Sequence, residues 1–348
     1  MSLSDASGFP SPTVSVVIPA YNAATTLPAC LTALLHQTVP LDPAEIIVVD
    51  DGSHDGTAAV ATCLGVRVIC QPHTNQAAAR NRGAKVARGT ILLFTDADCE
   101  PAPDWVERML APFADPTVAG VKGRYRTRQR GIVPRFIQQE FEQKYDHLRR
   151  SRQLDFIDGY AAGYRRDVFF ALGGFDPRYP PVEDIELSFR AARQGYRLVF
   201  APDAVVYHRH RETLRDYART KARAATLWVE VYRAHPTKIA NDSRQPYLVV
   251  LQIVAIGLGG MLLPLLPFSR QARRPAGLLS LGFLATTLPL TLRALRSDPA
   301  IAPAVPFLSL VRATSQAFGI ARGVGQRLAR HPALATLKRE RPALRQHG

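Results

Sequence analysis

The chain has 348 residues, 47% of them hydrophobic, a composition that excludes a disordered protein and allows one large domain plus a smaller part. Its net charge of +15 is uneven, because residues 1–208 hold 22 Lys and Arg against 23 Asp and Glu, whereas residues 209–348 hold 22 against 6. The basic C-terminal part indicates an anionic partner, either a membrane surface or a nucleic acid. The four cysteines show no metal-ligand spacing and fit a reduced, cytosolic compartment.

The first hundred residues alternate predicted strands with predicted helices. Short apolar runs predict strands at Val14–Ile18, Glu45–Val49, Val66–Cys70 and Thr90–Phe94. Helical spacing and capping residues predict a helix capped by Thr25 or Thr26, a second that begins at Ser53, Asp55 or Thr57, and a third over Asn75–Ala87. This alternation predicts βαβ units and therefore an α/β fold with a mostly parallel sheet.

Polar loops follow three of these strands, with the sequences PAYN (19–22), DDGS (50–53) and DAD (96–98). The carboxyl ends of parallel strands meet at one edge of a sheet, so these loops predict a nucleotide pocket there. Asp96 and Asp98 offer hard oxygens that suit Mg²⁺ or Mn²⁺, which in turn binds phosphate. For an isolated D-x-D, a polar turn remains the alternative.

The middle of the chain offers weaker signals. Residues 120–130 alternate basic residues with others, as an exposed or edge strand does, and residues 132–152 predict an amphipathic helix. The stretch 156–166 is rich in small residues, which would let a sugar ring approach the backbone closely. Asp158 in this stretch is a candidate ligand for a sugar hydroxyl.

Two acidic residues, Glu183 and Asp184, open a predicted helix over Ile185–Gln194. On the residues alone, a favourable interaction with the helix dipole explains them. A carboxylate that acts as a catalytic base is the other interpretation.

Six segments, taken together and in order, resemble the family 2 glycosyltransferases, which have the GT-A fold. The resemblance covers about residues 14–208, and the segments are VSVVIPAYN (14–22), IIVVDDGSHDGT (46–57), AAARNRGAKVARG (77–89), LLFTDADCEP (92–101), GGFDP (173–177) and EDIELSFRAARQGYRL (183–198).

The resemblance implies a binding site for the donor, a nucleotide-diphosphate sugar, with a UDP-sugar as the first candidate. The residues that it implies for the nucleoside are Pro19, Ala20, Tyr21, Asn22 and Asp51.

The resemblance also implies residues for the diphosphate and its cation. Arg80 matches the basic residue near the diphosphate, with a solvated helix face as the alternative. Asp96 matches the first acid of the D-x-D. Asp98 is the stronger candidate for contact with Mg²⁺ or Mn²⁺. His208 is a looser match to the position at which several members place a histidine that contacts the pyrophosphate or the metal, and a structural histidine at the end of a strand is the alternative. Around the reacting sugar, Asp184 matches the catalytic base, and its neighbour Glu183 is a candidate substrate ligand.

Two uncharged runs in the C-terminal part, residues 247–268 and 275–292, have the length and composition of membrane segments. A pair of buried core helices is the alternative. The intervening Ser269–Arg274 is basic, so a re-entrant hairpin and two true spans both remain open. The basic tail fits an anionic leaflet.

These observations divide the chain into a disordered N-terminus (1–12), a GT-A catalytic domain (13–235), a membrane-associated helical region (236–325) and a basic tail (326–348). The Gln-x-x-Arg-Trp signature of processive members is replaced by residues 215–219, which predicts transfer of single sugars. We expect a hexosyltransferase that acts on a lipid or cell-envelope glycan at the inner membrane, with its catalytic domain facing the cytoplasm.

Two alternatives remain from the sequence. One is a transferase that uses a polyprenyl phosphate as acceptor, and the other is a non-catalytic protein that binds membrane surfaces. Nucleic acid is not expected as a partner, since no basic strand interleaved with aromatic residues and no helix-turn-helix pattern is present.

Overall fold

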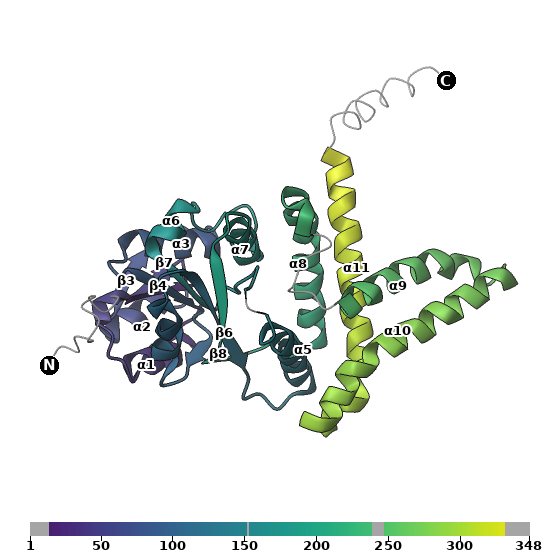
Figure 1. Ribbon diagram of the computed structural model, residues 1–348, viewed down its shortest axis with the longest axis horizontal. Coiled ribbons are helices and arrows are strands. Elements are labelled where there is room, and N and C mark those ends of the chain that lie inside the picture. The colour runs from purple at the N-terminus through teal and green to yellow at the C-terminus, as the bar shows by residue number, and fades with distance from the viewer. Residues whose placement is uncertain (1–13, 152, 239–246, 331–348) are drawn as a thin grey trace, which may run out of the picture. The chain divides into compact units, whose positions relative to one another are not determined.

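The computed structural model describes residues 14–151, 153–238 and 247–330, and these fall into two compact units (Figure 1). The first unit extends to His210 and the second begins at Arg211. The helix α8 (Leu214–Ala234) groups with the second unit, so the division lies before residue 235, the boundary that was expected from the sequence. The predicted disordered N-terminus and residues 331–348 of the basic tail lie outside the described residues.

The described part of the first unit contains a sheet of eight strands in the order β3-β2-β1-β4-β7-β6-β8-β5. Its strands are β1 (Val14–Ala20), β2 (Ile46–Asp50), β3 (Arg67–Cys70), β4 (Ile91–Thr95), β5 (Cys99–Pro101), β6 (Val118–Arg126), β7 (Ala161–Arg165) and β8 (Arg197–His208). The first four are all parallel to one another, whereas β7 is antiparallel to both of its neighbours and β5 is antiparallel to β8. The predicted α/β fold is confirmed, with a parallel half that is followed by a mixed half.

The parallel half is covered by helices on both faces. Figure 1 shows α1 (Leu27–Leu35) and α2 (Thr57–Cys63) on one face and α3 (Gln76–Val86) on the other. Every residue of β2 and of β4 is buried, as expected for strands that are covered on both sides. The connection reverses direction after β3, so the crevice at which such sheets bind ligands lies between β1 and β4.

Close packing of α3 against the sheet requires a glycine at position 83. A Cβ atom there would lie 2.4 Å from Cγ1 of Val17 and 3.1 Å from Cγ2 of Val49. The absence of a side chain lets the helix approach β1 and β2 closely. The close approach also sets how near to the sheet Arg80 lies, one turn earlier on the same helix.

The expectation of an exposed or edge strand at 120–130 is wrong. The strand β6 lies inside the sheet between β7 and β8, and Lys122 within it is completely buried. Its basic residues do not mark a solvated face, because Lys122 forms an ion pair with Asp158 and Arg124 forms one with Glu142. The remaining helices of this unit are α4 (Trp105–Leu110), α5 (Ile132–Leu148), α6 (Arg166–Ala171) and α7 (Glu183–Arg193).

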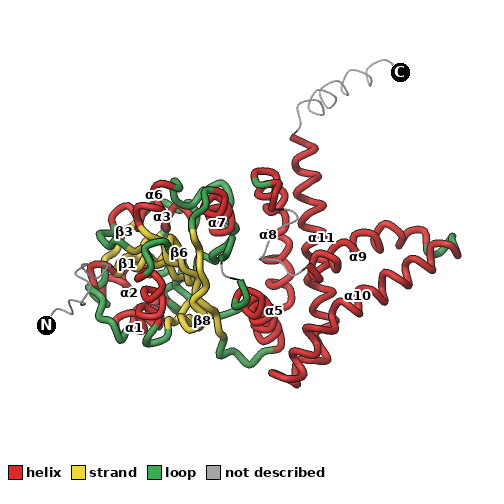
Figure 2. The backbone as a smooth tube through the Cα atoms, in the orientation of Figure 1, coloured by secondary structure: helices red, strands yellow, loops and turns green. Residues whose placement is uncertain are grey.

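The second unit is helical throughout its described residues (Figure 2). It consists of α8, α9 (Tyr247–Leu262), α10 (Arg270–Ser297) and α11 (Val305–Arg330), with short 3₁₀ turns between them. Within the described residues, two stretches, Tyr247–Leu265 and Arg270–Ser297, are long and apolar enough to cross a membrane. Only 11% and 22% of their most apolar windows are buried, so these helices leave most of their apolar surface exposed.

The close approach of α3 to the sheet gives a first prediction. Gly83→Ala should lower the free energy of unfolding by about 1–3 kcal/mol, because the added methyl group overpacks the contact with Val17. The matched control is Lys85→Ala, which changes an exposed residue on the same helix and should leave stability nearly unchanged. Thermal unfolding of the two variants checks this, and equal midpoints would contradict the close contact.

Candidate active site

The predicted nucleoside residues lie at the ends of β1 and β2. Asn22 adopts a positive φ of 49°, and its backbone N–H donates to Oγ of Ser53 at 2.9 Å. Its side-chain Oδ1 accepts from the backbone N–H of His54 at 3.0 Å. These bonds fasten the loop after β1 to the loop after β2. The half-exposed ring of Tyr21 stacks on His73 at 4.1 Å, while Ala20 is buried in β1.

Asp51 is 3% exposed and holds a neighbouring segment in place. Its carboxylate accepts hydrogen bonds from Nε2 of Gln71 at 2.6 Å, from the backbone N–H of Thr74 at 3.0 Å and from the Thr74 hydroxyl at 2.9 Å. Nδ1 of His73 lies 3.1 Å from Oδ2 of Asp51. The segment 71–74, with the His73 ring against Tyr21, is therefore positioned by this one carboxylate.

Arg80 joins the loop after β4 to the start of α7. Its NH2 group lies 2.6 Å from Oδ1 of Asp96, and its NH1 group lies 2.6 Å from Oε1 of Glu183. Burial lowers the pKa of the guanidinium, but the charges of Asp96 and Glu183 outweigh that effect and raise its pKa above the ordinary value. Arg80 is only 2% exposed, so it lies beneath the surface of the site as a bridge between two carboxylates.

The two acids at the start of α7 have different surroundings. Glu183 is 1% exposed and accepts from Nε2 of Gln76 at 2.7 Å as well as from Arg80. Asp184 is less buried, and its Oδ2 accepts from the backbone N–H of Gly159 at 2.8 Å.

The pKa of Asp184 is unusual for a carboxyl group. Desolvation, followed by the negative charges of Glu183 and Asp158, raises the pKa of Asp184 to about 7, although the Gly159 N–H and Arg80 oppose the shift. A carboxylate with this pKa is suited to accept a proton from a hydroxyl group near neutral pH.

The two predicted metal residues are brought together. Among the described residues, Asp98, Cys99 and His208 form a cluster whose ligand atoms lie within 4.8 Å of one another. Nε2 of His208 is 3.6 Å from Oδ2 of Asp98, near the spacing of about 3 Å that two adjacent ligands of an octahedral cation adopt. Burial raises the pKa of the Cys99 thiol well above its ordinary value, so it stays protonated and is a poor ligand for a hard cation.

A buried hydroxyl beside this cluster also fits a ligand with phosphate or water oxygens. Tyr125 is 2% exposed, and its hydroxyl has no hydrogen-bond partner among the residues that the structure describes. Burial and the nearby Cys99, Tyr160, Asp96 and Asp98 raise the pKa of this hydroxyl well above its ordinary value, so it remains a donor. Leaving such a donor unpaired costs about 1–3 kcal/mol, which an acceptor oxygen in the site would recover.

Asp158, the predicted ligand for a sugar hydroxyl, is held by two lysines. Lys122 forms an ion pair with it, and Nζ of Lys144 lies 3.1 Å from both carboxylate oxygens. Burial raises the pKa of Asp158, but the two ammonium groups outweigh it and hold the pKa well below its usual range. Asp158 is 7% exposed and has two cationic partners.

Three buried residues of the site, Lys122, Lys144 and Tyr125, were not among the candidates from the sequence. They lie on β6 and α5, where nothing in the sequence distinguishes a buried polar residue from a solvated one. His210 carried a signal, because residues i and i+2 of a strand share one face and His208 was already a candidate; its ring lies 3.0 Å from that of His208, between Nδ1 atoms.

Comparison with known proteins gives a consistent result. The family model described as "Glycosyl transferase family 2" matches residues 15–173. The pre-mycofactocin glycosyltransferase of Mycobacterium tuberculosis is 32% identical over 237 residues, which are 65% of this chain and 49% of that protein. Glycosyltransferase AglE of Haloferax volcanii is 30% identical over 234 residues, which are 63% of this chain and 75% of that protein.

A solved structure shares the fold. Mannosyltransferase PcManGT from Pyrobaculum calidifontis, in complex with GDP-Man and Mn²⁺, superposes with a TM-score of 0.56 and 24% identity, over 92% of this chain and 88% of that one. This likeness confirms the predicted GT-A fold. The chain spans about half the length of the mycobacterial relative, so the matched region is only part of that protein.

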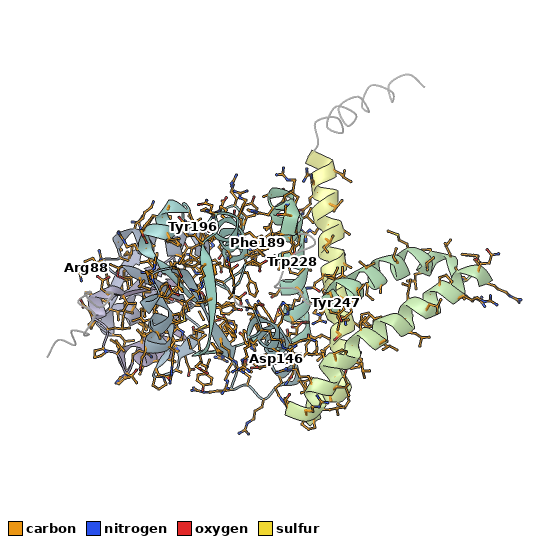
Figure 3. The ribbon with its side chains drawn as sticks, in the orientation of Figure 1. Arg88, Asp146, Phe189, Tyr196, Trp228 and Tyr247 are labelled. Atoms are coloured by element: carbon orange, nitrogen blue, oxygen red, sulfur yellow. The ribbon has the colours of Figure 1, made fainter. Side chains whose placement is uncertain are left out.

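The bridge formed by Arg80 gives a second prediction. Arg80→Met should destabilise the first unit by about 3–5 kcal/mol, because it leaves the carboxylates of Asp96 and Glu183 without their buried cation. The matched control is Arg88→Met, since Arg88 also pairs with two carboxylates but lies at the surface, as Figure 3 shows. Denaturant unfolding measures both, and equal losses of stability would contradict a special role for the buried bridge.

Proposed function

Because the chain belongs to glycosyltransferase family 2, we propose that it moves a single sugar from a nucleotide-diphosphate sugar to a hydroxyl group of a lipid or glycan acceptor. One observation carries the proposal. Asp98, which pairs with His208 and suits a divalent cation, follows Asp96 by two residues, and Asp184, a carboxyl group with a pKa of about 7, directly follows Glu183. Arg80 bridges Asp96 and Glu183 and so connects the two parts of the site. In transfer to a hydroxyl group, a cation offsets the charge that develops on the leaving diphosphate and a base accepts the proton of the hydroxyl.

The donor would lie along the carboxyl edge of the parallel strands. The half-exposed ring of Tyr21 could stack on the nucleobase of the donor. The loops after β1 and β2, which are hydrogen-bonded to each other, would bind the ribose. The diphosphate would then extend toward Asp98 and His208. A Mg²⁺ or Mn²⁺ ion held there would supply positive charge to offset the charge that develops on the leaving diphosphate.

Asp184 would remove the proton of the acceptor hydroxyl while the hydroxyl oxygen attacks the anomeric carbon of the donor sugar. The bond from this oxygen to the sugar forms while the bond to the diphosphate breaks, so a direct displacement inverts the anomeric configuration. The Gly159 N–H, 2.8 Å from Oδ2, holds the carboxylate in one orientation. Arg80 orients the neighbouring Glu183 and so fixes the first turn of α7, from which Asp184 projects.

The second unit would attach the enzyme to the cytoplasmic face of the inner membrane. Its two long apolar helices are mostly exposed, as expected for surfaces that face lipid. Between α9 and α10 lies an apolar groove lined by Leu251, Leu258, Leu278 and Phe283, among others. Arg270, Arg273 and Arg274 at the start of α10 suit the anionic headgroups of a membrane.

The role of Asp184 gives a third prediction, which also tests the class of acceptor. Asp184→Asn should lower kcat by about 10²–10⁴-fold while donor binding changes little, because the amide keeps the bond from Gly159 but cannot accept the proton. Asp203→Asn, at an exposed acid on β8, is the matched control and should retain full activity. Release of the nucleoside diphosphate during turnover measures both variants.

A phosphate acceptor would give the opposite result. The oxygen of a polyprenyl phosphate is already ionised and needs no base, so Asp184→Asn would then keep most of its activity. That outcome would replace the hydroxyl acceptor by a lipid phosphate while leaving the donor chemistry unchanged.

The pKa of Asp184 gives a fourth prediction. Only the ionised carboxylate can accept a proton, so kcat/KM should rise about tenfold per pH unit below pH 7 and level off above it. The pH profile of kcat/KM measures this. A profile that is flat between pH 5 and 8 would contradict the assignment of Asp184 as the base.

A further inference from the structure

We propose that Gln138 and His210 are positioning residues that present the Nε2 lone pair of His208 to the cation site. Neither residue was among the candidate site residues from the sequence. The inference rests on the proposed function, because it concerns a residue that would hold the divalent cation. It is carried by a chain of hydrogen bonds whose direction can be followed from one end to the other.

The chain of hydrogen bonds begins at the side-chain amide of Gln138 on α5. Its nitrogen Nε2 lies 3.1 Å from the backbone oxygen of Tyr125 and 2.9 Å from Oε1 of Glu142. The peptide oxygen can only accept, and Glu142 is a carboxylate paired with Arg124, so both positions require a donor. The NH₂ group of Gln138 must therefore face them, and its oxygen Oε1 faces His210.

The direction of the next two bonds follows. Oε1 of Gln138 lies 3.2 Å from Nε2 of His210, and as an acceptor it requires a proton on that nitrogen. A neutral imidazole carries one ring proton, so Nδ1 of His210 is an acceptor. Nδ1 of His208 lies 3.0 Å from it and must donate. The Nε2 of His208 is then left with its lone pair, 3.6 Å from Oδ2 of Asp98.

Both rings are also fixed in orientation. The ring of His208 stacks on Tyr125 at 4.6 Å with an interplanar angle of 12°, and the ring of His210 stacks on Phe141 at 5.5 Å and 10°. His210 is 4% exposed, and its backbone N–H and carbonyl both bond to the side chain of Gln129, at 2.6 and 3.0 Å. Stacking holds each imidazole in its plane, and the contacts of Nδ1 and Nε2 of His210 with His208 and Gln138 set which way round the rings lie.

The chemical consequence concerns affinity for the cation. A histidine without such a partner populates both neutral tautomers, and the form with a proton on Nε2 cannot bind a metal through that atom. Partners of metal-binding histidines commonly contribute 10–100-fold to metal affinity. Gln138 and His210 would thus act through His208 without contact with the substrate.

The tautomer can be observed directly in the full-length protein without any metal. Histidine ring ¹⁵N–¹H correlation spectra at pH 8 distinguish the two neutral forms, and His208→Gln identifies the signals of His208 among the nine histidines. We expect the Nδ1–H form for His208 and the Nε2–H form for His210. A predominant Nε2–H form of His208 would overturn the proposal.

Two substitutions at His210 test the effect on the cation. His210→Phe retains the ring stacked on Phe141 but removes the acceptor, so Mn²⁺ affinity should fall about 10–100-fold. His210→Asn places an amide oxygen near the position of Nδ1 and should restore most of the affinity. Electron paramagnetic resonance of Mn²⁺, titrated with each full-length variant, measures this.

The outcomes separate the two claims. Unchanged Mn²⁺ affinity in His210→Phe, with binding lost in Asp98→Ala, would overturn the positioning role and leave the cation site intact. If the wild-type protein binds no Mn²⁺, the metal part of the proposed function fails, and the tautomer of His208 still decides whether Gln138 and His210 orient it.

Discussion

The site depends on one buried cation, the guanidinium of Arg80. It is 2% exposed and lies 2.6 Å from a carboxylate on each side, Asp96 at the end of β4 and Glu183 at the start of α7. These two elements are far apart in the sequence, and Arg80 itself comes from a third, α3, whose close approach to the sheet depends on Gly83. A single ion-pair bridge therefore sets the relative positions of the D-x-D loop and the helix that carries Asp184.

The distribution of the other cations explains why Asp184 differs from its neighbours. Arg80 neutralises Asp96 and Glu183, and Lys122 and Lys144 neutralise Asp158. Asp184 has only backbone donors at hydrogen-bond distance among the contacts of the described residues, with other carboxylates nearby. Burial and these negative charges raise its pKa to about 7, which lets a carboxyl group act as a base near neutral pH. The negative charge of these carboxylates, close to Asp98, would also attract a divalent cation.

Local patterns in the sequence predicted the parallel half of the sheet, because each strand there is an apolar run that is followed by a helix with its own spacing and caps. The family resemblance, and not a local pattern, pointed to Asp98 and His208 as candidate metal residues. The mixed half was harder to predict, because the basic residues of β6 are typical of a solvated strand. Only the position of Asp158 beside Lys122 explains why this strand is buried. Arg80 illustrates the same limit. The family resemblance matches it to a basic residue near the diphosphate, but its burial between two acids depends on contacts across the fold.

Calorimetric titration of the detergent-purified protein with a panel of nucleoside diphosphates, with and without Mn²⁺, tests most directly whether this acidic edge binds a sugar nucleotide. If this edge is the donor site, one diphosphate should bind tightly, its binding should require Mn²⁺, and Asp98→Ala should abolish it. The identity of that diphosphate would name the donor class. Failure of every diphosphate to bind, in protein shown to be folded, would contradict the assignment of this edge as the donor site.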